Sequence, residues 1–217
     1  MTLTQLTDGL WRWTARHPEW HPGQWGAEVA CFAVDAGDVM LLIDPLVDEP
    51  DRLDEIVDKA VAILITIPYH ARSAEALRKR YKGTIHGHPN VALRLTKTTG
   101  FKPIEAGAEL PGGARAYAIG KPRRDEMPIH LPSHNALAAG DTLVTTPEGD
   151  LRLWHWRDIV DEKRIRWYRE RFNPTLQPLL ELDLDRILVT HGEPILSYGS
   201  AALQAAVDAE PWYYKSS

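Results

Sequence analysis

The stretch at residues 63–75 constrains the fold of this chain more than any other part of the sequence. Residues 61–66 form a short, uncharged, aliphatic run, which is typical of a buried strand. Pro68 ends that run, and Ser73 is a candidate N-cap for the helix-forming residues that follow it. The side chains between them therefore lie on a strand-to-helix turn. In α/β layers, turns at the carboxyl ends of strands commonly carry the functional residues.

The rest of the chain alternates between apolar strands and helical segments. We expect strands at residues 9–14, 29–34, 39–43, 83–88, 114–119, 127–131, 136–140, 142–145, 151–154 and 186–190. We expect helices at residues 49–60, 74–80, 90–96, 158–171, 175–182 and 201–209. The strands at 29–34 and 39–43 flank an Ala-Gly-Asp turn, which predicts a hairpin. This order predicts two sheets with helices outside them, in a single domain over residues 1–217.

Composition limits the classes of partner. The chain has 217 residues, of which 44% are hydrophobic and 25% charged, as in ordinary soluble proteins. Its net charge of -5 argues against nucleic acid as a partner, because phosphate binding needs a basic face. No apolar run approaches the about 20 residues of a membrane helix, and the start has no signal-peptide pattern. We therefore expect a cytoplasmic protein with no membrane partner, in which Cys31 is a small core residue.

Three short motifs follow buried or half-buried strands in the second half of the chain. They are Pro132-Ser133-His134, Gly140-Asp141 and His191-Gly192. In this order, after a strand that ends at Thr66, they resemble the metal-binding motifs of the metallo-β-lactamase superfamily. The resemblance covers about residues 10–191 and implies an αββα sandwich. It also implies that His134, Asp141 and His191 belong to the site, with Asp44 supporting it from behind.

The superfamily's main ligand cluster, Thr-His-x-His-x-Asp-His, is not kept in this chain. Ile67, Tyr69, Ala71 and Arg72 stand at its four ligand positions. The resemblance therefore implies that a dinuclear centre is lost, and two outcomes stay open. Two histidines and one carboxylate, namely His134, Asp141 and His191, could hold a single divalent metal, with zinc as the first candidate. Alternatively, the same residues form a hydrogen-bonded network without a metal.

Arg72 favours the second outcome because a guanidinium cannot lose its proton and become a ligand. We expect Arg72 to lie within salt-bridge or single-water reach of Asp141 and to stand in for a metal ion. The alternative is that Arg72 points into solvent. Tyr69 is expected in the pocket, either donating a hydrogen bond or packing. His70 lies between ligand positions, so we expect it to face away from the site and to be structural.

Several other features have simpler interpretations. His86 and His88 have the spacing of a ligand pair but follow the helix, so we expect structural roles. The first long loop is expected to overhang the site; its candidate residues are His17, Trp20, His21 and Trp25. Aromatic residues at 167–168 and, after Pro211, at 212–214 are expected near the surface, where they would favour a homodimer.

Three functions remain open from the sequence. The first is a hydrolase-like protein with a degenerate metal site that binds a small anionic molecule near Arg72, His134 and His191. The second is a mononuclear metallohydrolase that uses His134, Asp141 and His191 to activate water against an ester, thioester or amide. The third is a non-catalytic interaction protein with a vestigial pocket. The sequence does not identify the substrate, because one fold serves many chemistries.

Overall fold

The computed structural model describes residues 1–21, 26–155 and 160–214. Seven strands form the first sheet in the order β1-β2-β3-β4-β5-β6-β7. They are β1 (Thr4–Thr7), β2 (Leu10–Arg16), β3 (Glu28–Asp35), β4 (Val39–Ile43), β5 (Ala60–Ile65), β6 (Thr84–Gly87) and β7 (Phe101–Pro103). The pairs from β1 to β4 are antiparallel, and those from β4 to β7 are parallel. Strands β4 and β5 therefore end at the same edge of the sheet.

The second sheet has four strands in the order β13-β10-β9-β8. They are β8 (Arg115–Ala116), β9 (Ile129–Leu131), β10 (Ala136–Ala139) and β13 (Arg186–Val189). Strands β9 and β10 form an antiparallel hairpin, whereas β10 and β13 run parallel. A separate pair joins β11 (Leu143–Thr145) to β12 (Leu151–Leu153). As in the first sheet, two parallel strands, here β10 and β13, end side by side.

The two sheets face each other across the main core. Phe32 and Leu64 from the first sheet meet Ile129 and Leu188 from the second, and all four are almost fully buried. Because side chains alternate along a strand, Ile63 and Ile65 point to the opposite face of the first sheet. Strand β5 is apolar throughout because both faces of the sheet are covered at this strand.

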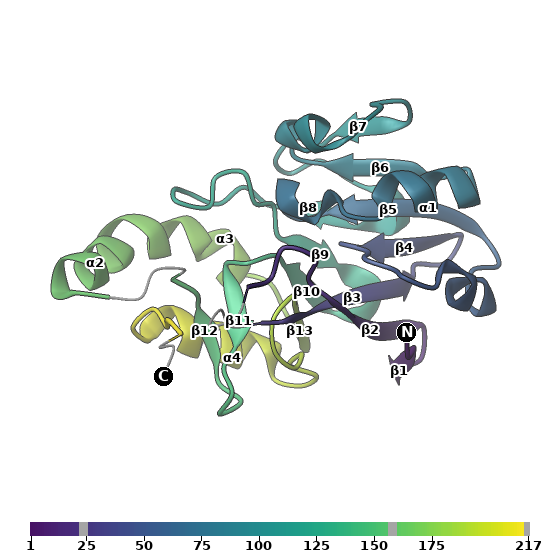
Figure 1. The fold of residues 1–217 in the computed structure, drawn as a ribbon. Helices are drawn as coiled ribbons and strands as arrows, with labels where there is room; N and C mark the ends of the chain where they lie inside the picture. The colour runs from purple at the N-terminus through teal and green to yellow at the C-terminus, as the bar shows by residue number, and fades with distance from the viewer. Residues whose placement is uncertain (22–25, 156–159, 215–217) are drawn as a thin grey trace.

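Helices cover the outer faces of both sheets (Figure 1). On the first sheet, Leu77 of α1 (Ala74–Tyr81) packs in one cluster with Ile63. On the second, Leu203 of α4 (Gly199–Asp208) packs with Ile187, next to α2 (Glu162–Trp167) and α3 (Gln177–Leu180). Figure 1 shows α1 at one end of the molecule and α2, α3 and α4 at the other. The layers are therefore helix, sheet, sheet and helix, which confirms the predicted αββα sandwich.

Two expected helices are instead short 3₁₀ turns. They are η1 (Pro50–Glu55), where residues 49–60 were expected to be helical, and η3 (Pro89–Arg94), where residues 90–96 were expected. Each begins with proline, which suits a first turn, but each buries a single apolar side chain, Leu53 or Val91. A segment with so little apolar surface against the core gains too little from packing to extend into a longer α-helix.

The helix expected at 158–171 begins at Glu162, where the Asp161 side chain accepts a hydrogen bond from the Arg164 amide. Residues 158–159 of that prediction lie outside the described residues. The helix continues as a π-helical turn over Tyr168–Phe172. Tyr168 is 2% exposed, so the prediction that it lies at the surface is wrong. Its ring packs edge-on against Trp167 and Phe172, which stabilises this helical layer rather than an interface.

The C-terminal aromatic residues are partly covered. Trp212 bridges to Trp154 and donates its backbone amide to Leu153, while Tyr214 is 36% exposed. The predicted homodimer through this tail stays a prediction. Across the described residues, none of the helices combines the length and the apolar character needed to span a membrane.

Candidate functional site

Four polar side chains meet where parallel strands of the two sheets end. Asp44 follows β4, and Thr66 follows β5. In the second sheet, Asp141 follows β10, and His191 follows β13. Because each pair of strands is parallel, these residues leave the sheets at common edges. The fold therefore builds a polar centre from segments that are far apart in the sequence.

Asp44 is the hydrogen-bond acceptor at the base of this centre. It is 3% exposed, and its backbone has a positive φ of 47°. Its carboxylate accepts the Thr66 amide at 2.8 Å, the Thr66 hydroxyl at 2.5 Å and the Nδ1 of His70 at 2.8 Å. A buried carboxylate is stable only with such partners. Asp44 therefore holds Thr66 and His70 in place from beneath the centre.

His70 faces into the centre, and the expectation that it faces away is wrong. It lies on η2 (Pro68–Ala71), a 3₁₀ turn in which its amide donates to the carbonyl of Ile67 at 2.9 Å. Residues three apart share a face of such a turn, so His70 is buried beneath it together with Ile67. Tyr69, one residue earlier, points outward and is 63% exposed. The tight turn thus reverses the directions that an extended motif would give.

The His70 ring joins two carboxylates. Its Nδ1 contacts Asp44, and its Nε2 lies 3.3 Å from Oδ1 of Asp141. Burial and the nearby Arg72 charge both lower the pKa of His70, but the two carboxylates outweigh them and raise it above its ordinary value. This environment favours an imidazolium, in which both ring nitrogens carry a proton.

Asp141 has a second cation beside it, and that cation is not Arg72. The described ion pairs of Asp141 are with His70, with Arg123 at 3.9 Å and with His191 at 3.8 Å. Burial alone would raise the pKa of Asp141, but these groups hold it well below its ordinary range. Asp141 is therefore an ionised carboxylate with two protein cations beside it, His70 and Arg123.

Arg72 forms no direct salt bridge with Asp141, and the predicted reach through a single water stays a prediction. Its Nη1 instead donates to the backbone carbonyl of Asp44 at 3.2 Å, and its charge acts on the buried Cys31 thiol. The reason lies in the turn: Arg72 ends η2 with a positive φ of 32°, which directs its side chain past Asp44. Arg123 is in the loop between β8 and β9, where no sequence motif marked it.

His191 covers the other side of Asp141. It is 5% exposed and meets the Trp154 ring edge-on at 5.3 Å. Burial is the main reason why its pKa falls to about 4, so the imidazole is neutral at pH 7. A β-carbon on Gly26 would come within 2.3 Å of the His191 ring, and Gly26 has a positive φ of 79°. Only glycine lets the backbone approach His191 so closely there.

The structure does not bring His134 together with Asp141 and His191. His134 lies on η5 (Pro132–His134), before β10 begins, whereas Asp141 follows the end of β10. The strand separates the two residues, because the β9–β10 hairpin places its turn at the edge opposite to Asp141. His134 instead contacts the Ser133 hydroxyl at 2.9 Å and the Asp8 carbonyl at 3.1 Å, near the surface.

Glu126 is a buried acid beside the centre that the sequence analysis missed. It is fully buried, and one carboxyl oxygen accepts the Thr142 amide at 2.9 Å. Burial raises the pKa of Glu126 to about 7, and the Arg123 charge only partly opposes this. A possible sequence signal was its position in an Arg-Arg-Asp-Glu run beside the second sheet, but such a run commonly marks a solvated loop.

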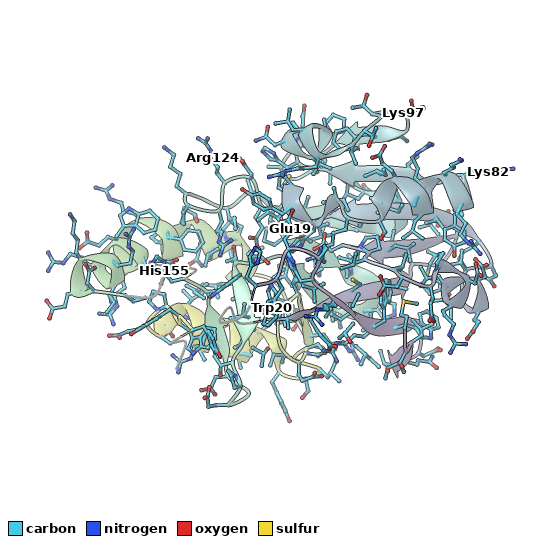
Figure 2. All side chains as sticks on the ribbon, in the orientation of Figure 1. Glu19, Trp20, Lys82, Lys97, Arg124 and His155 are labelled. Carbon is cyan, nitrogen blue, oxygen red and sulfur yellow. The ribbon has the colours of Figure 1, made fainter. Side chains whose placement is uncertain are left out.

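The loop between β2 and β3 contributes to the same end of the molecule. Partial burial, together with the charges of Arg72 and His70, lowers the pKa of His17, so His17 lies near these two residues of the centre. Figure 2 shows Glu19 and Trp20 of this loop near the middle of the molecule. His21 is exposed, and Trp25 lies outside the described residues.

The two histidines of the His86-Gly87-His88 segment have local structural contacts. His86 lies within 2.8 Å of the Thr84 hydroxyl, and burial lowers its pKa to about 4. His88 accepts the Asn90 amide at 3.1 Å and so caps η3.

Comparison with known proteins identifies the fold. The chain resembles a metallo-β-lactamase from Erythrobacter litoralis, with 18% identity, a TM-score of 0.63 and coverage of 95% of this chain and 94% of that one. It also resembles an archaeal metallo-β-lactamase superfamily protein from Sulfolobus tokodaii, with 14% identity, a TM-score of 0.61 and coverage of 82% and 78%. The chain therefore has the metallo-β-lactamase fold.

A third similar structure is larger. Rubredoxin oxygen:oxidoreductase from Desulfovibrio gigas matches with 15% identity and a TM-score of 0.65, over 95% of this chain. The chain spans 60% of the length of that protein. No family model matches the sequence, and no curated protein sequence matches it. At these identities the comparisons establish the fold, and the residues of this chain must carry any argument about chemistry.

The donor set at the centre does not fit a resident metal ion. His70 faces two carboxylates that favour its protonated form, which has no lone pair for a metal. Arg123 stands 3.9 Å from the carboxylate that a metal would need, and its charge would repel a cation. Among residues 1–21, 26–155 and 160–214, no three His, Cys, Asp or Glu side chains are grouped to hold a metal.

Proposed function

We propose that this chain is a metallo-β-lactamase-fold protein in which protein cations replace the metal, and which binds a small anionic molecule beside that centre. The observation that carries the proposal is the environment of Asp141. The carboxylate meets His70 at 3.3 Å and Arg123 at 3.9 Å. Two protein cations thus supply the positive charge that a metal ion would otherwise bring to a buried carboxylate.

The anionic ligand follows from the charge around the centre. The described residues Arg72, Arg94, Arg123 and Arg124 lie at or next to it, whereas its inner carboxylates are already paired. A negatively charged molecule would meet net positive charge at the mouth and would displace little structure. The chemistry that this arrangement supports best is recognition rather than metal-assisted hydrolysis.

Metal analysis tests the proposal directly. The protein is purified without chelator, and its zinc, iron and manganese are measured against protein concentration, with zinc calorimetry on the same sample. We expect well below one metal ion per chain and no saturable zinc binding. The matched variants are His191→Ala, at the centre, and His134→Ala, on the surface turn. Stoichiometric metal that is lost in His191→Ala and kept in His134→Ala would overturn the proposal and favour a metallohydrolase.

A further inference from the structure

A pocket of about 590 Å³ opens directly beside the buried centre. Its walls are η2, η3 and the loop at residues 120–128. The Met127 amide donates to the Thr66 carbonyl at 2.7 Å, so this loop is attached to the same strand end that carries the centre. Pockets that hold small ligands have volumes of about 300–1,000 Å³. The cavity is therefore of the size that a small organic molecule fills.

Two arginines of this pocket have charge to offer a ligand. The Arg94 guanidinium lies 4.7 Å from the centre of the Tyr69 ring, and no described carboxylate pairs with Arg94. Arg124 pairs with the adjacent Asp125 at 3.6 Å, and both side chains are well exposed. Exposed pairs of this kind are weak, so a ligand can compete for Arg124. Figure 2 shows Arg124 on the loop that borders the pocket.

The third arginine of the pocket has a different role. The Arg123 side chain is 11% exposed, lies 3.9 Å from Asp141 and stands over the Trp154 ring at 5.5 Å. It therefore separates the pocket from the buried centre. The pocket carboxylate Asp125 accepts the Asn90 side-chain amide at 3.0 Å and is the counter-charge of Arg124. Arg94 has no described carboxylate partner, so the charge of Arg94, Arg124 and Asp125 together is positive at the mouth.

Large apolar side chains surround these charges. Tyr69 is 63% exposed and Leu93 is 81% exposed, so both present apolar surface to water. Pro122 completes this apolar part of the wall. Exposed apolar surface beside uncompensated positive charge matches a molecule that has an apolar body and an anionic end.

We infer that this pocket binds an anion with an apolar body, an aryl or acyl group that ends in a carboxylate or a phosphate. The inference rests on the proposed function and narrows it. Arg94 and Arg124 hold the anionic end through charge-assisted hydrogen bonds. Tyr69 and Leu93 cover the apolar body and exclude water from it. Simple anions lack the second of these contacts, and neutral aryl compounds lack the first.

Calorimetry with four probes tests the inference on the full chain. The probes are phenylacetate, phenyl phosphate, acetate and phenylacetamide. We expect the two aryl anions to bind at least about tenfold more tightly than acetate or the neutral amide. Arg94→Met, which keeps the side-chain stem, should weaken phenylacetate about tenfold. Leu93→Ser should weaken phenylacetate and leave acetate unchanged. Arg171→Met, an exposed arginine far along the chain, is the matched control and should change nothing.

The outcomes separate this inference from the proposed function. Equal affinity for acetate and phenylacetate would overturn the aryl preference and leave the anion site in place. Equal affinity for phenylacetate and phenylacetamide would overturn the role of the anionic end. If the parent protein binds none of the probes, the ligand site in both proposals is wrong. The claim that protein cations replace the metal would then still be tested separately, by the metal analysis. Loss of binding in Arg171→Met would place the site elsewhere and overturn the inference.

Discussion

Tyr69 and His70 are neighbours in the chain and belong to opposite environments. His70 is 3% exposed and lies between the carboxylates of Asp44 and Asp141. Tyr69 is 63% exposed and lies under the Arg94 guanidinium. In the buried centre, His70 lies between two carboxylates, and Asp141 has both His70 and Arg123 beside it. In the pocket, positive charge and apolar surface both face water. The comparison indicates that the centre holds the fold together and that the pocket is the part available to a ligand.

Among the variants that test this comparison, His70→Ala should have the largest effect on the free energy of unfolding. Removing the imidazole leaves two buried carboxylates without their shared partner, and breaking a buried pair costs about 3–5 kcal/mol. Urea unfolding at pH 6 should report a loss of that size. His134→Ala, at the exposed turn, is the control and should cost less than about 1 kcal/mol. Similar losses in both variants would contradict the special role of the buried centre.

The second test uses the pH dependence of stability. Because the pKa of Glu126 is about 7 when folded and 4.5 is its ordinary value, the folded protein retains a proton that the unfolded chain loses. The contribution of this proton to the free energy of unfolding is therefore fully present below pH 4.5 and is lost as the pH rises through about 7. The total loss is at most about 3 kcal/mol.

Glu126→Gln should remove this dependence and keep the contact with the Thr142 amide. Relative to the parent protein, the variant should gain stability between pH 5 and pH 8, as measured by urea unfolding at each pH. The contribution of His70 is present in both proteins and cancels in the difference. A difference that stays constant with pH would show that Glu126 titrates normally.

Arg123→Met tests whether Arg123, which lines the pocket, belongs energetically to the buried centre. The variant removes one cation from Asp141, whose charge remains buried, so we expect a loss of about 1–3 kcal/mol in unfolding free energy. Arg124→Met, at the next residue, loses only an exposed ion pair and should cost less than about 0.5 kcal/mol. Denaturant midpoints of the two variants, measured side by side, check the difference. A larger loss of unfolding free energy in Arg124→Met than in Arg123→Met would show that Arg123 is not the arginine that stabilises the buried centre.

The smallest expected effect on stability is that of Leu93→Ser. Leu93 is 81% exposed, so its replacement should change the free energy of unfolding by no more than about 0.5 kcal/mol. Thermal unfolding of the variant alongside the parent tests this. A large loss would show that Leu93 packs against the protein, and it would then no longer be available to cover a ligand.

The sequence by itself determined the layers of this protein. Local patterns were sufficient there: the aliphatic run of β5, the hairpin of β3 and β4, and the strands before Asp141 and His191 all follow from apolar periodicity and turn residues. Asp44, Asp141 and His191 were correctly expected at strand ends, because a strand that ends in a polar residue shows this directly in the sequence.

Only the tertiary structure decided which side chains meet. The direction of His70 depends on the 3₁₀ turn after Ile67, and the distance of His134 from the centre depends on the end of β10 at which it lies. Arg123 reaches Asp141 from a loop that no motif marked. A single tight turn or a hairpin reverses which way a side chain points, and these choices are made by packing between distant segments. Local patterns therefore predicted the sheets, whereas the partners of Asp141 required the folded chain.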